Sequence, residues 1–172
     1  MSVFRIYVEK KPEFAVEAQS VLNDVQTALR LSISGIRILN RYDADNLSQE
    51  DFEAAVNTVF SEPAVDVTYT ELPKLSGSER VFAVEYLPGQ FDQRADSAVQ
   101  CVQFLDENAQ PIIRSATTYV IEGDITEEEF EAIRNHCINP VDSRETGLQK
   151  PETLVTAVSY THLRAHETLM NL

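Results

Sequence analysis

Leu-Pro-Gly-Gln-Phe-Asp-Gln-Arg-Ala-Asp-Ser is the stretch at residues 87–97, and it joins a predicted strand to a predicted helix. Before it, residues 80–86 alternate between apolar and polar side chains, as a strand does. Pro88-Gly89 then ends the strand, because proline lacks a backbone donor and glycine permits a sharp turn. From Asp92 the apolar residues recur at helical spacing, which predicts a helix over 92–105.

This strand–turn–helix unit presents free backbone N–H groups and a positive dipole end beyond the turn. Arg94 lies in the first helical turn, where the dipole disfavours a cation unless that cation faces an anion or a carboxylate. A purely structural corner, with Arg94 paired to Glu85, Asp92 or another carboxylate, is the alternative. The candidates for a docking or substrate-proximal role are Pro88, Gly89, Gln90, Gln93 and Arg94.

Composition limits the classes of protein that this chain can represent. Its 172 residues suffice for one domain, or for two small halves that share a core. A net charge of −14 argues against nucleic acid or an anionic membrane as partners, because both require clustered Lys and Arg. No apolar run is long enough to span a bilayer, and the N-terminus begins with a strand-like pattern rather than a signal peptide.

The two cysteines, Cys101 and Cys137, provide no disulfide framework and no metal-ligand spacing, so both are expected to be buried as small apolar residues. This cysteine usage indicates a cytoplasmic protein. The acidic segment 124–131 is interpreted as a solvated first helical turn rather than a metal site. His136 is interpreted as a surface residue near a helix C-terminus, because its neighbour Cys137 points in another direction on a helix.

The predicted elements follow the same order twice. The first half has strands at 3–9, 36–39 and 65–69, a helix that begins near Pro12, and a helix that begins at Ser48. Residues 72–79 are a predicted linker. The second half has strands at 81–86 and 112–122, the helix at 92–105, and a helix that begins with a full capping box at Thr126 and Glu129.

Two sequence matches at an offset of 78 residues suggest a duplication: Val3-Phe4 with Val81-Phe82, and 48–54 with 126–132. The fold class predicted is α+β, with tandem ferredoxin-like halves at about 1–72 and 80–140 that pack as a pseudo-dimer. Each half should carry its own helical layer on an antiparallel or mixed sheet. The expected core residues are Phe14, Val21, Val25, Phe52 and Val56, matched by Ala95, Ala98, Val102, Phe130 and Ile133.

The C-terminal part differs in character from the predicted N-terminal domain at 1–140. Residues 141–157 are polar and rich in turn formers, which predicts a linker that leaves the domain. His162 and His166 have the spacing of a helical metal pair. However, residues 158–168 match the translation of a sequencing adapter residue for residue, so the whole segment 158–172 is attributed to that origin. It is therefore expected to be an artefactual tail without specific tertiary contacts.

Residues 3–12, Val-Phe-Arg-Ile-Tyr-Val-Glu-Lys-Lys-Pro, and the segment 87–101 together resemble phosphoribosylformylglycinamidine synthase. The resemblance is to the large single-chain form of Gram-positive anaerobes, and it covers residues 2 to about 154. It implies that the chain is the enzyme's N-terminal domain, which in that family resembles a fused dimer of the small S subunit of the split enzyme. The missing synthetase and glutaminase domains of the same polypeptide would then be its partners.

The resemblance also implies a reaction. The full-length enzyme is an ATP-dependent ligase of purine biosynthesis that uses Mg²⁺ and glutamine to convert formylglycinamide ribonucleotide to its amidine. This chain has no glycine-rich phosphate loop in its sequence, so no catalytic, cofactor-binding or metal-binding residue is assigned to it. Alone it is expected to be an inactive structural and channel-forming domain. The alternative is a free-standing tandem ferredoxin-like module that binds a small regulator.

Overall fold

The computed structural model describes residues 2–75 and 77–154. Its strands form one antiparallel sheet in the order β3-β1-β2-β5-β4-β6. The central strands β2 (Gly35–Asp45) and β5 (Ile112–Glu122) pair with each other along their whole length. The outer strands are β1 (Phe4–Lys10), β3 (Asp66–Tyr69), β4 (Arg80–Tyr86) and β6 (Ser143–Thr146). The predicted α+β class is confirmed.

Four α-helices lie between these strands in the chain. They are α1 (Val16–Thr27), α2 (Gln49–Ala55), α3 (Gln93–Leu105) and α4 (Glu127–Cys137). The N-termini of α2 and α4 follow the predicted capping rules: the Ser48 side chain accepts from Asp51 N, and Thr126 and Glu129 form the full capping box. A 3₁₀ turn at Pro12–Phe14 precedes α1, and a π-helical turn at Val56–Phe60 continues α2.

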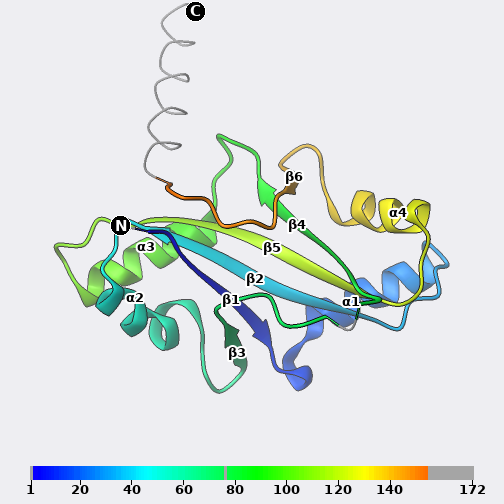
Figure 1. Cartoon of the computed structure of the whole chain (residues 1–172), viewed down its shortest axis with the longest axis horizontal. Helices are drawn as coiled ribbons and strands as arrows, with labels where there is room; N and C mark the ends of the chain where they lie inside the picture. Colours follow the sequence, from blue (N-terminus) through cyan, green and yellow to red (C-terminus); the bar gives the residue numbers. More distant parts are fainter. Residues whose placement is uncertain (1, 76, 155–172) are drawn as a thin grey trace, which may run out of the picture.

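The helices form two pairs, α2 with α3 and α1 with α4 (Figure 1), and each pair joins the two halves of the chain. In the first cluster, Phe52 of the first half packs with Ala98 and Val102 of α3. In the second, Val25 of α1 packs with Phe82 and Ile133. The expectation of a separate helical layer for each half is therefore corrected: both hydrophobic clusters draw on both halves.

Most of the expected core residues lie in these two clusters. Val25, Phe52, Ala95, Ala98, Val102, Phe130 and Ile133 are buried, and Val21 and Val56 are partly buried. Phe14 is the exception, since 45% of its surface is exposed. Phe14 belongs to the 3₁₀ turn before α1. Because the residues per turn differ between a 3₁₀ turn and an α-helix, its side chain does not continue the apolar face of α1. Both cysteines are less buried than expected: Cys101 is exposed and Cys137 is half-buried.

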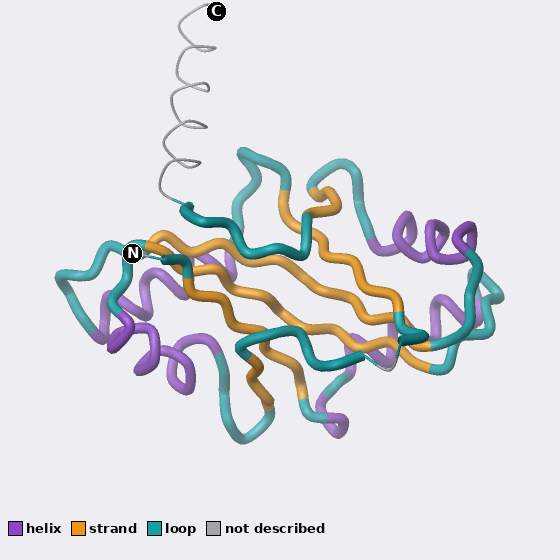
Figure 2. The backbone as a smooth tube through the Cα atoms, viewed as in Figure 1, coloured by secondary structure: helices purple, strands orange, loops and turns teal. Residues whose placement is uncertain are grey.

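Two irregular segments cover the sheet face that the helices leave open. Figure 2 shows residues 70–75 and 77–79 and the C-terminal segment 147–154 crossing over the strands. Leu72 of the first packs against Tyr7, Leu39 and Val120. We call the second segment, residues 147–154, the C-terminal strap. The inter-half linker predicted at 72–79 thus lacks regular structure where it is described, but it also covers part of the sheet.

The C-terminal strap is held by buried charges on β1 and β2. Arg5 Nη1 donates to Leu148 O at 2.7 Å, and Arg41 Nη1 donates to Gly147 O at 2.9 Å. Asp45 Oδ2 accepts from Leu154 N at 2.7 Å, and the Leu154 side chain is buried. The prediction that 141–157 simply leaves the domain is therefore wrong for its described part, which contains β6 and this strap.

Strand β2 is also longer than the predicted 36–39 and runs on to Asp45. Its second part is polar, but Arg41, Asp43 and Asp45 are buried on the strap face. Within the described residues, no helix is long and apolar enough to cross a membrane. The predicted artefactual tail at 158–172, with His162 and His166, lies outside the described residues.

Candidate functional site

The motif at residues 87–97 forms a turn that carries the chain from β4 into α3. Gln90 N donates to Leu87 O at 3.0 Å, and Gly89 has a φ of +91°. Proline followed by a residue of positive φ is the arrangement of a type II turn, and it requires glycine at the second central position. Pro88, Gly89 and Gln90 are exposed at its tip.

Asp92 fixes the position of this turn relative to the sheet. Its Oδ1 accepts from Ala95 N at 3.0 Å and caps α3, and the same atom accepts from Ser115 Oγ at 2.7 Å. Its Oδ2 accepts from Ser115 N at 2.9 Å. One carboxylate therefore joins the start of α3 to β5, and the residues that follow it are held at a defined place over the sheet.

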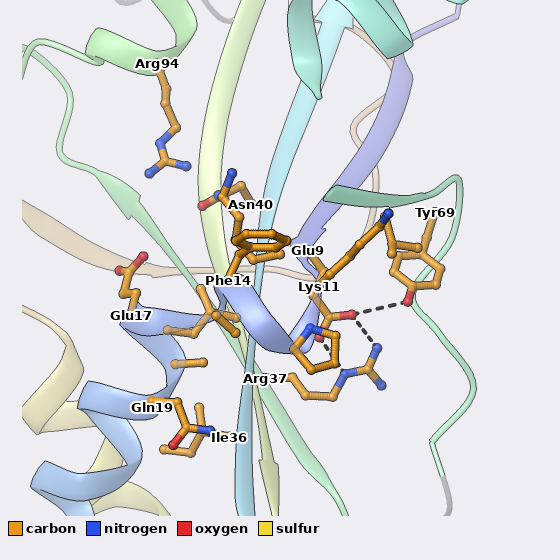
Figure 3. Close-up of a pocket in the computed structure, with 16 residues that line it drawn as sticks. Glu9, Lys11, Phe14, Glu17, Gln19, Ile36, Arg37, Asn40, Tyr69 and Arg94 are labelled. Carbon is orange, nitrogen blue, oxygen red and sulfur yellow. Dashed lines mark hydrogen bonds and ion pairs between the residues drawn. The ribbon is translucent and has the colours of Figure 1, made fainter. Parts of the chain in front are cut away.

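Arg94 projects from the first turn of α3 into the space between the two helix pairs. Figure 3 shows its guanidinium pointing toward the space that Asn40 of β2, Phe14 and Glu17 also line. Among the described residues, Arg94 has no ion pair with a carboxylate. Glu85 is bound by Arg144, and Asp92 is occupied by Ser115. The structural pairings considered for Arg94 with these two residues do not occur.

The cavity beneath Arg94 has a volume of about 570 Å³. This lies within the range of roughly 300–1,000 Å³ that small-molecule sites occupy. Its walls are largely apolar, with Phe14, Ile36, Ile38 and Val67 among the lining residues. Arg94 and Gln93 also border a second, shallower hollow beside Tyr42 and Cys101.

An ion-pair network joins three residues of β1, β2 and β3 that are also in contact with the larger cavity (Figure 3). Arg37 donates from Nε and Nη2 to the two oxygens of Glu9 at 2.8 and 2.7 Å, and Tyr69 Oη donates to Glu9 Oε1 at 3.2 Å. The bond to Glu9 raises the pKa of Arg37. Burial, reinforced by the Glu9 charge, raises the pKa of Tyr69. Arg37 and Glu9 are already paired with each other through two hydrogen bonds. We therefore interpret them as residues that shape the cavity and not as residues that bind a ligand.

Tyr42 lines the shallower hollow, and Arg94 borders both. Burial raises the pKa of the Tyr42 hydroxyl, and the neighbouring Arg94 charge opposes that rise. Cys101 is exposed at the edge of the shallower hollow, whereas burial raises the pKa of the Cys137 thiol to about 12. A thiol with such a pKa is almost entirely protonated at neutral pH and is a poor nucleophile.

The structure thus separates the five candidate residues into two groups. Gln93 and Arg94 border the cavities, and Pro88, Gly89 and Gln90 shape the turn at the surface. Sequence reasoning missed the opposite wall, Phe14, Asn40 and Tyr42, because these residues come from the other half of the chain. No group of three or more His, Cys, Asp or Glu residues is placed to hold a metal in the described part of the chain.

No protein-family model matches the chain, and no curated protein matches it.

Replacing Asp92 by alanine is expected to lower the free energy of unfolding by about 1–3 kcal/mol. The change removes the cap of α3 and leaves the Ser115 N–H without its acceptor. Asp96→Asn is the matched control, because Asp96 is exposed in the same helical turn and binds only Gln100 among the described residues. Urea unfolding measures both variants, and equal stability of the two would contradict the anchoring role of Asp92.

Proposed function

We propose that the chain is the N-terminal structural domain of a phosphoribosylformylglycinamidine synthase. The observation that carries the proposal is the motif at 87–97, which resembles that family and forms an anchored turn with Arg94 over a cavity. In the proposed enzyme, a synthetase domain and a glutaminase domain of the same polypeptide supply the ATP- and Mg²⁺-dependent chemistry in the cytoplasm. This domain supplies a surface on which the synthetase domain packs.

The regularity of the sheet supports the idea of a duplicated unit. From the centre of the sheet outward, the strands of the first half follow the order β2, β1, β3. Those of the second half follow the corresponding order β5, β4, β6. Strands β1 and β4 each have 7 residues, β2 and β5 each have 11, and β3 and β6 each have 4. A fused dimer of a β-α-β-α-β unit would have this arrangement. Its order differs from the β-α-β-β-α-β order of a ferredoxin-like half.

The spacing of the elements refines the proposed duplication. Strand β4 begins 76 residues after β1, β5 begins 77 after β2, and the cap Thr126 follows Ser48 by 78. By strand position, Phe4 therefore corresponds to Arg80 and not to Phe82. Phe52 and Phe130 have comparable surroundings under this alignment, since Phe52 stacks on Phe4 of β1 and the Arg80 guanidinium of β4 lies over the Phe130 ring, 5.2 Å from its centre.

Exposed apolar side chains around the turn support a packing role. Tyr86 and Phe91 flank the turn, with 46% and 68% of their surfaces exposed. Val141, 77% exposed, precedes Asp142, whose carbonyl accepts from Leu87 N at 2.9 Å. Large apolar residues that gather on one surface mark interaction sites in soluble proteins. The synthetase domain is the proposed occupant.

A binding measurement in trans tests this proposal. The chain is titrated into a clostridial-type synthase from which its own N-terminal domain has been deleted, and association is followed calorimetrically. We expect a one-to-one complex whose affinity falls at least roughly tenfold in Phe91→Ser, since large side chains at an interface centre contribute most of its energy. Phe104→Ser, which changes a phenylalanine 88% exposed at the far end of α3, serves as the control. Absence of any complex would overturn the proposal.

A small-molecule-binding regulatory module is the second candidate, and the cavity of about 570 Å³ favours it. Thermal unfolding in the presence of individual amino acids and nucleotides distinguishes the two. If the chain is a structural domain, we expect that no ligand raises its melting temperature through binding to Arg94. The purified chain is also expected to show no glutamine-dependent turnover.

A further inference from the structure

A second, smaller cavity lies on the opposite side of the sheet, beneath the C-terminal strap. Its volume is about 200 Å³. Its floor is formed by side chains of the central strands, including Arg41, Asp43 and Arg114, and Gly147, Gln149 and Pro151 of the strap form its outer wall. The volume is below the roughly 300 Å³ at which sites for drug-sized molecules begin, so only a small ion or molecule fits.

The lining of this cavity carries more positive than negative charge. Arg5, Arg41 and Arg114 line it, against Asp43 and Glu85. Glu85 is already bound by Arg144, with 2.8 Å between Oε2 and Nε. Asp43 is bound by Arg5 through two hydrogen bonds of 2.6 and 2.8 Å. In a chain with a net charge of −14, two guanidinium groups thus face this cavity: Arg41, which shares Asp43 with Arg5, and Arg114, which has no ion pair among the described residues.

Arg41 is the buried member of that pair, with only 5% of its surface exposed. Its Nη1 donates to Gly147 O, but its Nε lies 4.0 Å from the nearest oxygen of Asp43, beyond hydrogen-bond range. Neither Nε nor Nη2 forms a hydrogen bond within the described residues. Burial and the adjacent Arg5 charge lower the pKa of Arg41, and the Asp43 charge, 4.0 Å away and shared with Arg5, offsets this only in part.

Arg114 faces the same space from β5. Arg114 is the cross-strand neighbour of Asp43 in the pairing of β2 with β5. No ion pair joins Arg114 to a carboxylate among the described residues. Arg114 is exposed, so the cavity is open to solvent on its side. Two guanidinium groups that converge from neighbouring strands offer several N–H donors to one acceptor, which suits an oxyanion.

We propose that this cavity binds a small oxyanion of the phosphate class between Arg41 and Arg114. The ion accepts from the free nitrogens of Arg41 and supplies the negative charge that the buried cluster lacks. Because Arg41 also holds Gly147, the bound ion stabilises the C-terminal strap on the sheet. The proposal is independent of the proposed function, since it rests on the opposite face of the sheet.

Titration with inorganic phosphate tests the proposal. Thermal unfolding of the whole chain is followed at fixed ionic strength as phosphate replaces chloride, with acetate as a separate carboxylate series. We expect a saturable rise in melting temperature with phosphate. The apparent affinity should fall roughly tenfold or more in Arg114→Gln, because a charge-assisted contact is lost. Arg114 is exposed, so this variant retains the fold.

Arg37→Gln is the matched control, because Arg37 lies on the same strand and the same sheet face but is occupied by Glu9. Its phosphate affinity should equal that of the unmodified chain. An equal response to phosphate, acetate and chloride would reveal screening alone and overturn the proposal. So would a stronger response to acetate than to phosphate, or an unchanged phosphate affinity in Arg114→Gln.

Discussion

Asp43→Asn is expected to lower the free energy of unfolding by about 3–5 kcal/mol, as the loss of one partner of a buried ion pair does. Asparagine keeps the shape of the side chain but removes the charge that lies between Arg5 and Arg41. Both guanidinium groups would then remain buried, at 8% and 5% exposure, without a counter-charge. The same change should loosen the C-terminal strap, because Arg5 and Arg41 hold its carbonyl groups.

Chemical unfolding measures the first effect, and amide hydrogen exchange over residues 147–154 measures the second. Glu145→Gln is the control, since its ion pair with Arg134, at 3.0 Å, is largely exposed. Such a surface pair contributes less than about 1 kcal/mol. A loss below about 1 kcal/mol in Asp43→Asn, with unchanged exchange in the strap, would show that the buried cluster does not hold the strap.

Phe82→Ala is expected to lower the free energy of unfolding by about 3–5 kcal/mol, because it leaves a cavity in the second hydrophobic cluster. The Phe82 ring is 1% exposed and stacks on Tyr119, with 4.9 Å between the ring centres. It also meets the Phe130 ring edge-on at 5.7 Å. Truncation removes both aromatic contacts, which add to the loss from burial alone.

Phe104→Ala provides the comparison for this measurement. Phe104 is 88% exposed on α3, so its truncation should change stability by no more than about 0.5 kcal/mol. Both variants are unfolded in urea under the same conditions. Similar losses for Phe82→Ala and Phe104→Ala would contradict the assignment of the core that joins β4, β5 and α4.

Local patterns in the sequence predicted several elements closely. The alternation at 80–86 and the helical spacing after Asp92 gave β4 and α3, and the β-branched run at 112–122 corresponds to β5. The capping box at Thr126 marked the start of α4. These features succeed because each depends on residues close together in the chain: a cap, a proline or a repeated apolar position.

Features that depend on contacts between residues far apart in the chain could not be predicted from local sequence patterns. The second part of β2 looks polar, and only the strap and β5 explain why Arg41, Asp43 and Asp45 are buried there. Strand β6 has four polar residues and exists through its pairing with β4. The pairing of helices from different halves likewise depends on the packing of the whole sheet. No pattern within a single helix predicts which helix it packs against.

The candidate site was found in part. The motif directed attention to Gln93 and Arg94, and the structure places both at cavities. The opposing residues Phe14 and Asn40 come from the first half, and nothing in their local sequence distinguishes them from core or strand positions. The buried guanidinium groups beneath the strap were also missed, because strand alternation does not reveal which polar residues become enclosed.

Turnover by a chimeric enzyme tests the proposed function most directly. Residues 1–154 replace the N-terminal domain of a clostridial-type phosphoribosylformylglycinamidine synthase, and glutamine- and ATP-dependent formation of the amidine product is measured. The parent enzyme and the same enzyme without an N-terminal domain are the references. We predict that the chimera restores product formation that the deletion abolishes. A soluble, folded chimera with no more activity than the deletion would contradict the proposal that this chain is the N-terminal domain of such an enzyme.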